Sequence, residues 1–360
     1  MSQSYPNPLR VALVGCGDIA PTHAKALQKT TRAKLVACMD LAEASAKSLG
    51  EEYGVPYTTK LDELLARTDV DMITIATPAF THVDITARAA QAGKAVLCEK
   101  PLAATLEDAD GMLEACADGG VPLSTCFPLR YLGAAKWTRE LLDAGALGEI
   151  AYIRMLNLSE KKDSYWTGGF SGRTVTDWRK SKIASGGGIV ITNLVHHLDL
   201  ARAITGLEAA RAYAEVGTFA TEVEVEDIGL ASLRYENDAI GLVEGSSISW
   251  GGADSPFQMT FVGKQGQVRF ALWGGNAEAY LTEPSGDLPA REWIKRQFED
   301  QAHMDFYDDL AAALQSGDSP PVTGEDGRAA LEAVVAIYRS AGTGEPVLLP
   351  VEECALEDNQ

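Results

Sequence analysis

Residues 11–20 read VALVGCGDIA, an apolar run followed at once by a glycine-rich turn. Gly15, Gly17 and Ala20 give this turn a G-x-G-x-x-A pattern. Gly15 permits a tight turn after a strand, Gly17 lets the backbone approach a pyrophosphate, and Ala20 lets the next helix pack close to the sheet. Because the pattern is short and also fits a purely structural turn, its meaning depends on the surrounding sequence.

The first 126 residues alternate short apolar runs with stretches of helical periodicity. Strands are predicted over residues 10–14, 34–39, 71–76, 95–99 and 122–127, and helices over 21–30, 42–54, 61–68, 81–93 and 106–120. This alternation is typical of a parallel sheet with crossover helices. We therefore predict an α/β protein in which residues 1–126 form an NAD(P)-binding Rossmann domain.

Asp40 follows the second predicted strand, where this fold commonly places an acid that binds ribose. A carboxylate there accepts hydrogen bonds from ribose hydroxyls and repels a 2′-phosphate, and no arginine or lysine follows until Lys47. NAD is therefore favoured over NADP. The alternative is an aspartate that only caps the helix beginning at Leu41.

Two later segments end at the same edge of the predicted sheet. Residues 76–82 read ATPAFTH and residues 94–103 read KAVLCEKPLA. A lysine after the second of these strands can lie near the nicotinamide, where desolvation and the cofactor's charge would lower its pKa, but it can equally be a surface lysine. A histidine in the first turn of a helix is more often a solvated neighbour of the cap than a ligand. The predicted cofactor-binding residues are Gly15, Gly17, Asp18, Ile19, Asp40, Thr77, Pro78, His82, Glu99 and Lys100.

Length and charge restrict the classes of function. A chain of 360 residues exceeds one comfortable core, so residues 127–360 are predicted to form a second domain. A formal net charge of -20 disfavours nucleic acid and anionic membranes as partners. No run is long enough for a membrane span or a signal-peptide core, and a cytoplasmic protein is expected. The six cysteines contain no C-x-x-C pair, which favours reduced thiols over disulfides or a metal site.

The second half has a different periodicity. Alternating runs over residues 148–159, 210–219, 228–237, 239–249, 257–272 and 277–283 predict antiparallel strands. Residues 304–317 and 327–341 have the pattern of amphipathic helices. The acidic stretch VEVED, residues 223–227, is interpreted as structural.

Four segments together resemble the Gfo/Idh/MocA family of oxidoreductases, in the same order and over almost the whole chain. They are residues 14–20 (VGCGDIA), 76–103 (which contain CEKPLA), 185–206 (SGGGIVITNLVHHLDLARAITG) and 320–350. The resemblance implies a Rossmann domain followed by an α/β domain with a large, mostly antiparallel open sheet, whose outer face commonly forms homodimers or homotetramers. It also implies that Lys100 is catalytic and that the Lys100–Pro101 bond is cis.

The resemblance also distinguishes the two adjacent histidines. In the family pattern, the helix after the glycines carries a histidine that faces the nicotinamide, and this residue is His196. His197 is rotated by about 100° on a helix and points elsewhere, so the pair does not form a two-histidine metal site. Many relatives that act on sugars or cyclitols carry an aspartate where this chain has Thr192, followed here by Asn193. This departure puts the substrate class in doubt.

The segment before the glycines, residues 159–184, is rich in side chains that suit polyols. Aromatic faces cover the apolar side of a sugar ring, while arginine and aspartate bind its hydroxyls. A plain surface loop remains an alternative for most of it. The predicted substrate-binding residues are Lys100, Arg130 at the domain junction, Trp166 (or Tyr165), Trp178, Arg179, Thr192, Asn193 and His196.

These residues lead to a hypothesis for the reaction. His196 takes the proton of a secondary alcohol on a sugar or cyclitol, Lys100 stabilises the developing charge on that oxygen, and the carbon passes hydride to NAD. The alternatives are a redox-neutral NAD-dependent glycosidase, a keto-sugar reductase and a non-catalytic sugar-sensing regulator.

Overall fold

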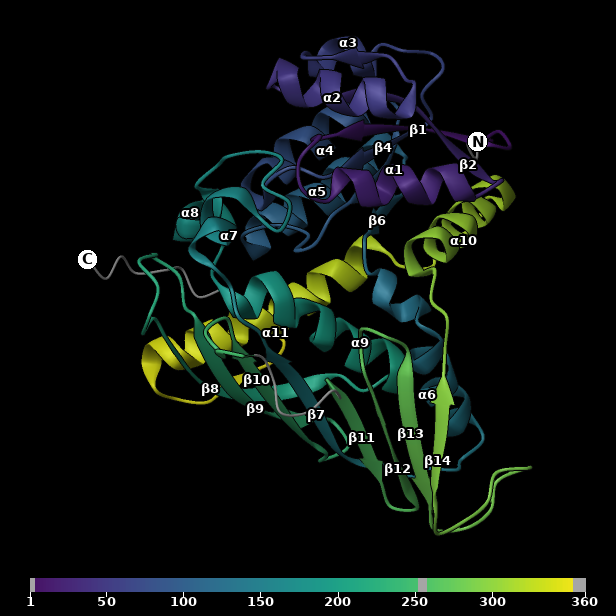
Figure 1. Cartoon of the computed structure of the whole chain (residues 1–360), viewed down its shortest axis with the longest axis vertical. Coiled ribbons are helices and arrows are strands. Elements are labelled where there is room, and N and C mark those ends of the chain that lie inside the picture. The colour runs from purple at the N-terminus through teal and green to yellow at the C-terminus, as the bar shows by residue number, and fades with distance from the viewer. Residues whose placement is uncertain (1–3, 252–257, 352–360) are drawn as a thin grey trace.

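A computed structural model describes residues 4–251 and 258–351 of the chain (Figure 1). Its N-terminal sheet is entirely parallel and has the strand order β3-β2-β1-β4-β5-β6. The strands are β1 Leu9–Val14, β2 Ala33–Met39, β3 Tyr57–Thr58, β4 Met72–Ile75, β5 Ala95–Cys98 and β6 Leu123–Thr125. Every residue of β4 and β5 is buried, as expected for strands covered on both faces. The predicted Rossmann arrangement is confirmed.

Helices connect these strands and cover both faces of the sheet. They are α1 Ala20–Lys29, α2 Glu43–Tyr53, α3 Leu61–Leu65, α4 His82–Gln91 and α5 Leu106–Gly119, with a short 3-10 turn η1 at Ala79–Thr81. The sequence predicted all five helices. It missed β3, a two-residue strand at the edge of the sheet that pairs with the end of β2.

The second domain contains a nine-stranded open sheet with the order β14-β13-β12-β11-β7-β10-β9-β8-β15. The strands are β7 Ile150–Leu158, β8 Ala209–Gly217, β9 Ile228–Tyr235, β10 Ile240–Ser246, β11 Met259–Gly263, β12 Gly266–Phe270, β13 Asn276–Leu281, β14 Trp293–Gln297 and β15 Val347–Leu348. Neighbouring strands are antiparallel except for β7 and β10, which run parallel at the centre. The predicted mostly antiparallel sheet is therefore confirmed, although the sequence missed β14 and β15.

Helices cover one face of this sheet (Figure 1). They are α6 Gly133–Asp143, α9 Val195–Thr205 and α11 Gly324–Thr343, while the shorter α7 Asp163–Gly168 and α8 Lys182–Ser185 lie toward the first domain. Three short turns are η2 Pro128–Tyr131, η3 Trp178–Lys180 and η4 Val190–Leu194. None of the helices within the described residues is long and apolar enough to cross a membrane.

Two helices from the end of the chain join the domains. Helix α10, Ala302–Ser316, packs against α1 and β2 of the Rossmann domain. Helix α11 begins beside β6, where Ser124 Oγ donates to Val322 O at 2.7 Å and Thr125 Oγ1 donates to Thr323 O at 3.1 Å. The division of the chain at residue 126 stays a prediction, and α10 packs on the domain that precedes that division.

Candidate active site

The G-x-G-x-x-A turn links β1 to α1 at the carboxyl edge of the parallel sheet. Gly15 has a φ of 95°, and a Cβ built on it would lie 2.6 Å from Ala76 O, so only glycine fits. A Cβ built on Gly17 would meet a single heavy atom of the described residues within 4 Å, Thr174 Oγ1 at 3.8 Å. The turn is therefore closed toward the strands and more open beside the start of α1, which suits the phosphates of a dinucleotide.

Asp40 lies directly after β2, beside this turn. One carboxylate oxygen accepts from Cys16 N and the other from Ala42 N, both at 2.8 Å. The residue therefore ties the phosphate-binding turn to Ala42, but it does not cap α2, which begins at Glu43 and has no side-chain cap, so the capping alternative is wrong. Since each carboxylate oxygen can accept a further hydrogen bond, Asp40 can also bind ribose hydroxyls.

The segment before the glycines lies across the same turn. Asp18 accepts hydrogen bonds from the backbone amides of Phe170 and Ser171 at 2.8 and 2.7 Å. Arg173 Nη1 donates to Glu52 of α2 at 3.1 Å. This part of the segment docks on the Rossmann domain, and the side chain of Asp18 is occupied by it.

The loop after β4 holds three of the predicted cofactor residues. Thr77 and Pro78 lie at the carboxyl edge, and Thr77 Oγ1 is 2.7 Å from Thr81 Oγ1. The ring nitrogens of His82 lie 3.0 Å from Leu102 O and 2.9 Å from Thr77 O. Burial lowers the pKa of His82, and its ring is bonded to backbone on both sides. The geometry gives His82 a structural role and leaves the predicted cofactor contact without support.

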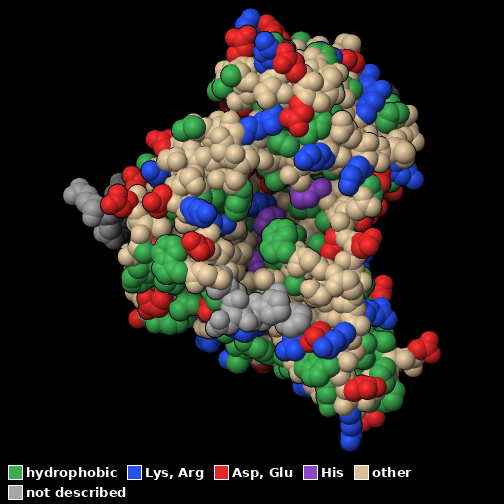
Figure 2. Space-filling view, in the orientation of Figure 1, with side chains coloured by type: hydrophobic (Ala, Val, Ile, Leu, Met, Phe, Trp, Pro, Cys, Tyr) green, Lys and Arg blue, Asp and Glu red, His purple; other side chains and the backbone are tan. Residues whose placement is uncertain are grey.

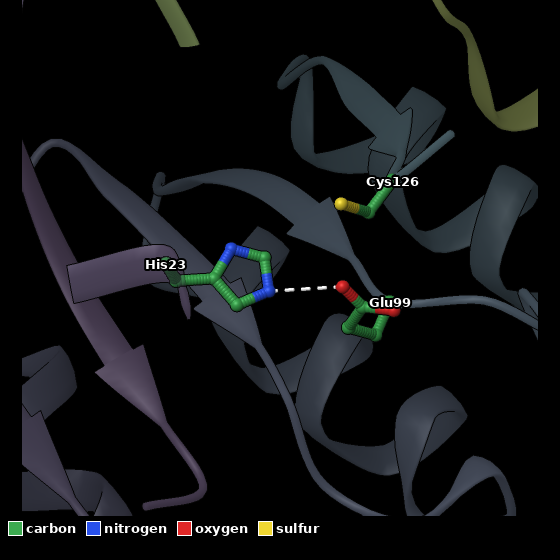
Figure 3. Close-up of side chains that lie close together, drawn as sticks. All are labelled: His23, Glu99 and Cys126. Atoms are coloured by element: carbon green, nitrogen blue, oxygen red, sulfur yellow. Dashed lines mark hydrogen bonds and ion pairs between the residues drawn. The ribbon is translucent and has the colours of Figure 1, made fainter. Parts of the chain in front are cut away.

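Strand β5 delivers Glu99 and Lys100 to this edge, and Figure 3 shows the buried polar network behind them. Glu99 Oε1 lies 2.9 Å from His23 Nε2, and Glu99 Oε2 accepts from Lys100 N at 3.1 Å. His23 Nδ1 in turn lies 2.9 Å from the hydroxyl of Tyr307 on α10. Burial acts to raise the pKa of Glu99, but the bond and charge of His23 and the charges of Lys100 and His303 outweigh it and hold the pKa low.

His23, Glu99 and Cys126 also bring three potential metal ligands within 4.8 Å of one another. Burial, and then the charge of Glu99, raise the pKa of the Cys126 thiol well above its usual value. His23 and Glu99 already bind each other. The cluster is therefore better explained as a hydrogen-bond network that fixes Glu99 than as a metal centre.

Lys100 reaches from the first domain into the second. Its ammonium donates to Thr192 O at 2.7 Å, and burial lowers its pKa. The Lys100–Pro101 peptide bond is cis, as the family resemblance implies. The lysine therefore lies against the chain just before the helix that carries His196.

The glycine turn that begins this helix is held by a buried carboxylate. Glu226 accepts from Gly188 N at 2.7 Å, from Val190 N at 3.0 Å and from the hydroxyl of Tyr338 at 2.7 Å. A Cβ on Gly188 would lie 1.9 Å from Glu226 O, so this close approach requires glycine. The turn continues into a short π-helix, η4, before α9 begins, and π-helical turns frequently mark functional sites.

His196 lies in the first turn of α9. Its ring packs edge-on against Phe127 with the ring centroids 5.8 Å apart, and its Nδ1 is buried with no hydrogen-bond partner among the described residues. Burial, reinforced by the charge of Lys100, lowers the pKa of His196 well below its usual value. The imidazole is therefore neutral at physiological pH, the state in which it can accept a proton.

His197 points away from this site, as the helical rotation predicts. Its ring nitrogens lie 3.3 Å from Asn193 O and 3.2 Å from Leu156 O of β7, and burial lowers its pKa to about 4. The Thr192 hydroxyl donates to Gly188 O at 2.6 Å and lies 3.1 Å from the side-chain oxygen of Asn193. The two histidines therefore have different environments in the structure.

An aromatic and cationic cluster from residues 159–184 lies beside Thr192. Tyr165 is half-buried, and Arg179 and Thr192 lie beside its hydroxyl. Arg179 packs over the rings of Trp178 and Tyr165 with its guanidinium carbon 4.6 and 5.3 Å from their centroids. Trp166 is 5% exposed, and its Nε1 has no hydrogen-bond partner among the described residues. The hollow between the domains in Figure 2 shows histidine, lysine or arginine, and hydrophobic side chains together.

Arg130 has a different environment from the one predicted. Its guanidinium binds Asp199 through two nitrogens at 2.5 and 3.0 Å and contacts Asp326 at 3.2 Å. Arg202 also binds Asp326, at 2.6 Å. This buried ion network joins η2, α9 and α11, so it positions the helix of His196, and nothing in it supports a substrate contact by Arg130.

Sequence reasoning missed three residues of the site. Glu226 was treated as part of an acidic linker, Tyr307 as one side of an amphipathic helix, and Lys161 was not considered. The contacts of Glu226 and Tyr307 join segments far apart in the chain. Lys161 packs over rings of its own segment, but no short motif marks that packing. The burial of a charged residue within a polar stretch is visible only in the folded chain.

Family models match both domains. Residues 9–127 match a model described as an oxidoreductase family with an NAD-binding Rossmann fold, and residues 136–269 match a GFO/IDH/MocA C-terminal domain. Myo-inositol 2-dehydrogenase of Thermotoga maritima is 27% identical over 331 residues, which cover 90% of this chain and 93% of the relative. 1,5-Anhydro-D-fructose reductase of Ensifer adhaerens is 28% identical, with 80% and 82% coverage.

Solved structures share the architecture as well. The WlbA dehydrogenase from Bordetella pertussis, solved in complex with NADH and UDP-GlcNAcA, matches with a TM-score of 0.81 and 27% identity. The match covers 96% of this chain and 99% of that protein. Both domains, their order along the chain and the nucleotide-binding turn therefore agree with one family. The chain belongs to the Gfo/Idh/MocA family of NAD-binding oxidoreductases.

Proposed function

We propose that this oxidoreductase transfers hydride between a secondary alcohol of a sugar or cyclitol and NAD, with Lys100 and His196 as catalytic residues. The observation that carries the proposal is the convergence of these two residues from different domains. Lys100 Nζ binds the carbonyl of Thr192, one helical turn before the neutral His196. The relatives named for inositol and anhydro-sugar substrates support the same class of reaction.

The residues divide the work as follows. His196 accepts the hydroxyl proton, and its neutral state prepares it to do so. Lys100 donates a hydrogen bond to the same substrate oxygen and stabilises its negative charge as the proton leaves. The Thr192 hydroxyl, whose proton is donated to Gly188 O, accepts from a neighbouring substrate hydroxyl, and Trp178 with Arg179 covers the ring. NAD, when bound, supplies the hydride acceptor.

We infer the cofactor contacts from the open side of the phosphate-binding turn. Gly15, Gly17 and the backbone at Asp18 and Ile19 would hold the pyrophosphate, and Asp40 the adenosine ribose. The rest of the proposed nicotinamide side is Thr77, Pro78, Glu99 and Lys100. The free acceptor capacity of Asp40 supports NAD rather than NADP. A spectrophotometric comparison of the two cofactors tests this choice, and equal efficiency with NADP would contradict it.

Turnover tests the reaction. The purified protein is mixed with NAD and a panel of inositols, aldoses and glycosides, and reduced nicotinamide is followed by absorbance. His196→Asn and Lys100→Met are each expected to lower kcat by about 10² to 10⁴-fold while NADH fluorescence still reports cofactor binding. Near-normal turnover in either folded variant would contradict the assignment. Consumption of a glycoside without net cofactor reduction would instead identify a redox-neutral glycosidase.

We also propose that the chain forms a homodimer or homotetramer through the outer face of the nine-stranded sheet. Within residues 4–251 and 258–351, helices cover only the other face of that sheet. Four large apolar or aromatic side chains lie on its strands between 39% and 45% exposed, namely Tyr213, Leu230, Ile240 and Trp293. An apolar sheet face of this kind is a typical surface for subunit association.

A further inference from the structure

Lys161 is a buried cation next to the proposed substrate site. It follows β7, and its backbone amide donates to Ser247 O at 2.7 Å. The residue is only 7% exposed, whereas its neighbour Lys162 is exposed. Within residues 4–251 and 258–351, no carboxylate oxygen lies within 4 Å of its ammonium. Buried lysines ordinarily have a charged or hydrogen-bonding partner.

The immediate surroundings of Lys161 connect it to the reacting groups. Its ammonium lies 4.6 Å from the ring centroid of Tyr165 and 4.2 Å from that of Phe170. Tyr165 lies beside Thr192, whose carbonyl binds the ammonium of Lys100. Tyr165 and Thr192 therefore connect Lys161 to Lys100, the proposed catalytic lysine.

Three cations converge here. Burial, and then the charges of Lys100 and Arg179, lower the pKa of Lys161 to about 8. Glu99, whose charge acts on Lys100, is bound to His23, and Asp18, which lies 3.9 Å from Arg179, accepts two backbone amides. The neighbouring groups Thr192 and Asn193 are uncharged. The Lys161 ammonium packs over two aromatic rings, and a negative charge placed among these cations would relieve their mutual repulsion.

From this arrangement we propose that the substrate is a sugar that carries an anionic group, and that Lys161 with Arg179 binds that group while Lys100 and His196 act on a ring hydroxyl. The inference rests on the proposed hydride transfer and refines its substrate class. A carboxylate and a phosphate share the required chemistry, and the test separates them.

The experiment uses matched pairs of substrates with the full-length enzyme and NAD. Each aldohexose is compared with its uronate and its 6-phosphate, which differ from it at one carbon. We expect kcat/KM for one anionic member to exceed that of the neutral sugar by about tenfold or more. The preferred member identifies the anion. If the wild-type enzyme has the same kcat/KM for the neutral sugar as for the uronate and the 6-phosphate, the proposal is overturned.

Variants then assign the effect to Lys161. Lys161→Met should reduce the ratio of anionic to neutral kcat/KM by about tenfold, whereas Lys162→Met, which removes the same charge at an exposed position, should retain it. An unchanged ratio in Lys161→Met would overturn the assignment. If no sugar is turned over at all, the proposed function is contradicted independently of this inference. In that case, the change in NADH fluorescence on adding glucuronate is compared with the change on adding glucose, which shows whether the anion binds.

Discussion

At the residue scale, the adjacent histidines of α9 have different environments because consecutive residues of a helix are rotated by about 100°. His196 faces Phe127 and the domain junction, and His197 faces the carbonyl of Leu156 beneath the helix. Both are neutral because burial removes the stabilising water from the charged form. Only the first is near the ammonium of Lys100, so only the first can share a substrate oxygen with it.

The buried state of His197 gives a prediction for stability. Its pKa is about 4 in the folded chain and near 6.5 when unfolded, so the unfolded state binds more protons between these values. The stability contribution is complete above pH 6.5 and is lost as pH falls toward 4, by about 3 kcal/mol. Urea unfolding at a series of pH values measures this loss. His197→Gln should show a shallower decline, and an identical slope would contradict the prediction.

Gly15 gives a prediction for cofactor binding. Gly15→Ala would place a methyl group 2.6 Å from Ala76 O at a positive φ. The turn must then shift away from the strands, and we expect NADH affinity to fall by at least about tenfold with a loss of stability of about 1 kcal/mol or more. Fluorescence titration with NADH measures the effect. Gly54→Ala, at a positive φ with nothing within 4 Å, is the matched control and should retain affinity.

Local spacing along one segment located the phosphate-binding turn. The roles of Lys100 and His196 came from the family resemblance and stay predictions. The environments of Arg130 and His82 could not be predicted in the same way, because the partners of Arg130 lie at Asp199 and Asp326 and those of His82 are backbone carbonyls. A sequence shows which side chains are capable of chemistry, but not which of them folding has already satisfied.

At the element scale, the segment of residues 159–184 contains only short helical elements joined by loops. Its docking on Asp18 is predicted to slow cofactor release. Asp18→Ala removes both acceptors of the Phe170 and Ser171 amides, so hydrogen–deuterium exchange at these two amides and the NADH dissociation rate should both rise several-fold.

The control for this prediction comes from the same segment. Asp177 is exposed, and Asp177→Ala removes an equal charge from the same region. It should leave amide exchange at residues 170 and 171 unchanged. Protection at those amides that persists in Asp18→Ala would show that the docking does not depend on Asp18.

Periodicity predicted the long elements and failed at short or unusual ones. Strands β3 and β15 have two residues each and lie at sheet edges, where few apolar positions mark them. The parallel pairing of β7 with β10 joins segments almost ninety positions apart, as in Tyr152 with Ile240, and no local pattern encodes it. The family resemblance implied a helix after the glycines, but not the π-helical turn Val190–Leu194 that precedes α9.

At the scale of the whole molecule, the exposed sheet face gives a prediction for assembly. Leu230→Lys and Ile240→Lys would place charges on the face that we propose as the subunit interface. Light scattering after size exclusion should show a dimer or tetramer for the wild type and smaller species for the double variant. Leu41→Lys, which alters a residue that is 85% exposed on the other domain, should leave the mass unchanged. A monomeric wild type would contradict the proposal.

The molecule also divides its tasks between its parts. Lys100 comes from a strand end of the Rossmann sheet and His196 from a helix on the second sheet, whereas the residues that we propose to select the substrate lie together in the segment of residues 159–184. That segment is one continuous stretch of the sequence, so it can be exchanged as a unit. Recombination or directed evolution confined to it could exchange one sugar for another while the hydride-transfer machinery is inherited intact.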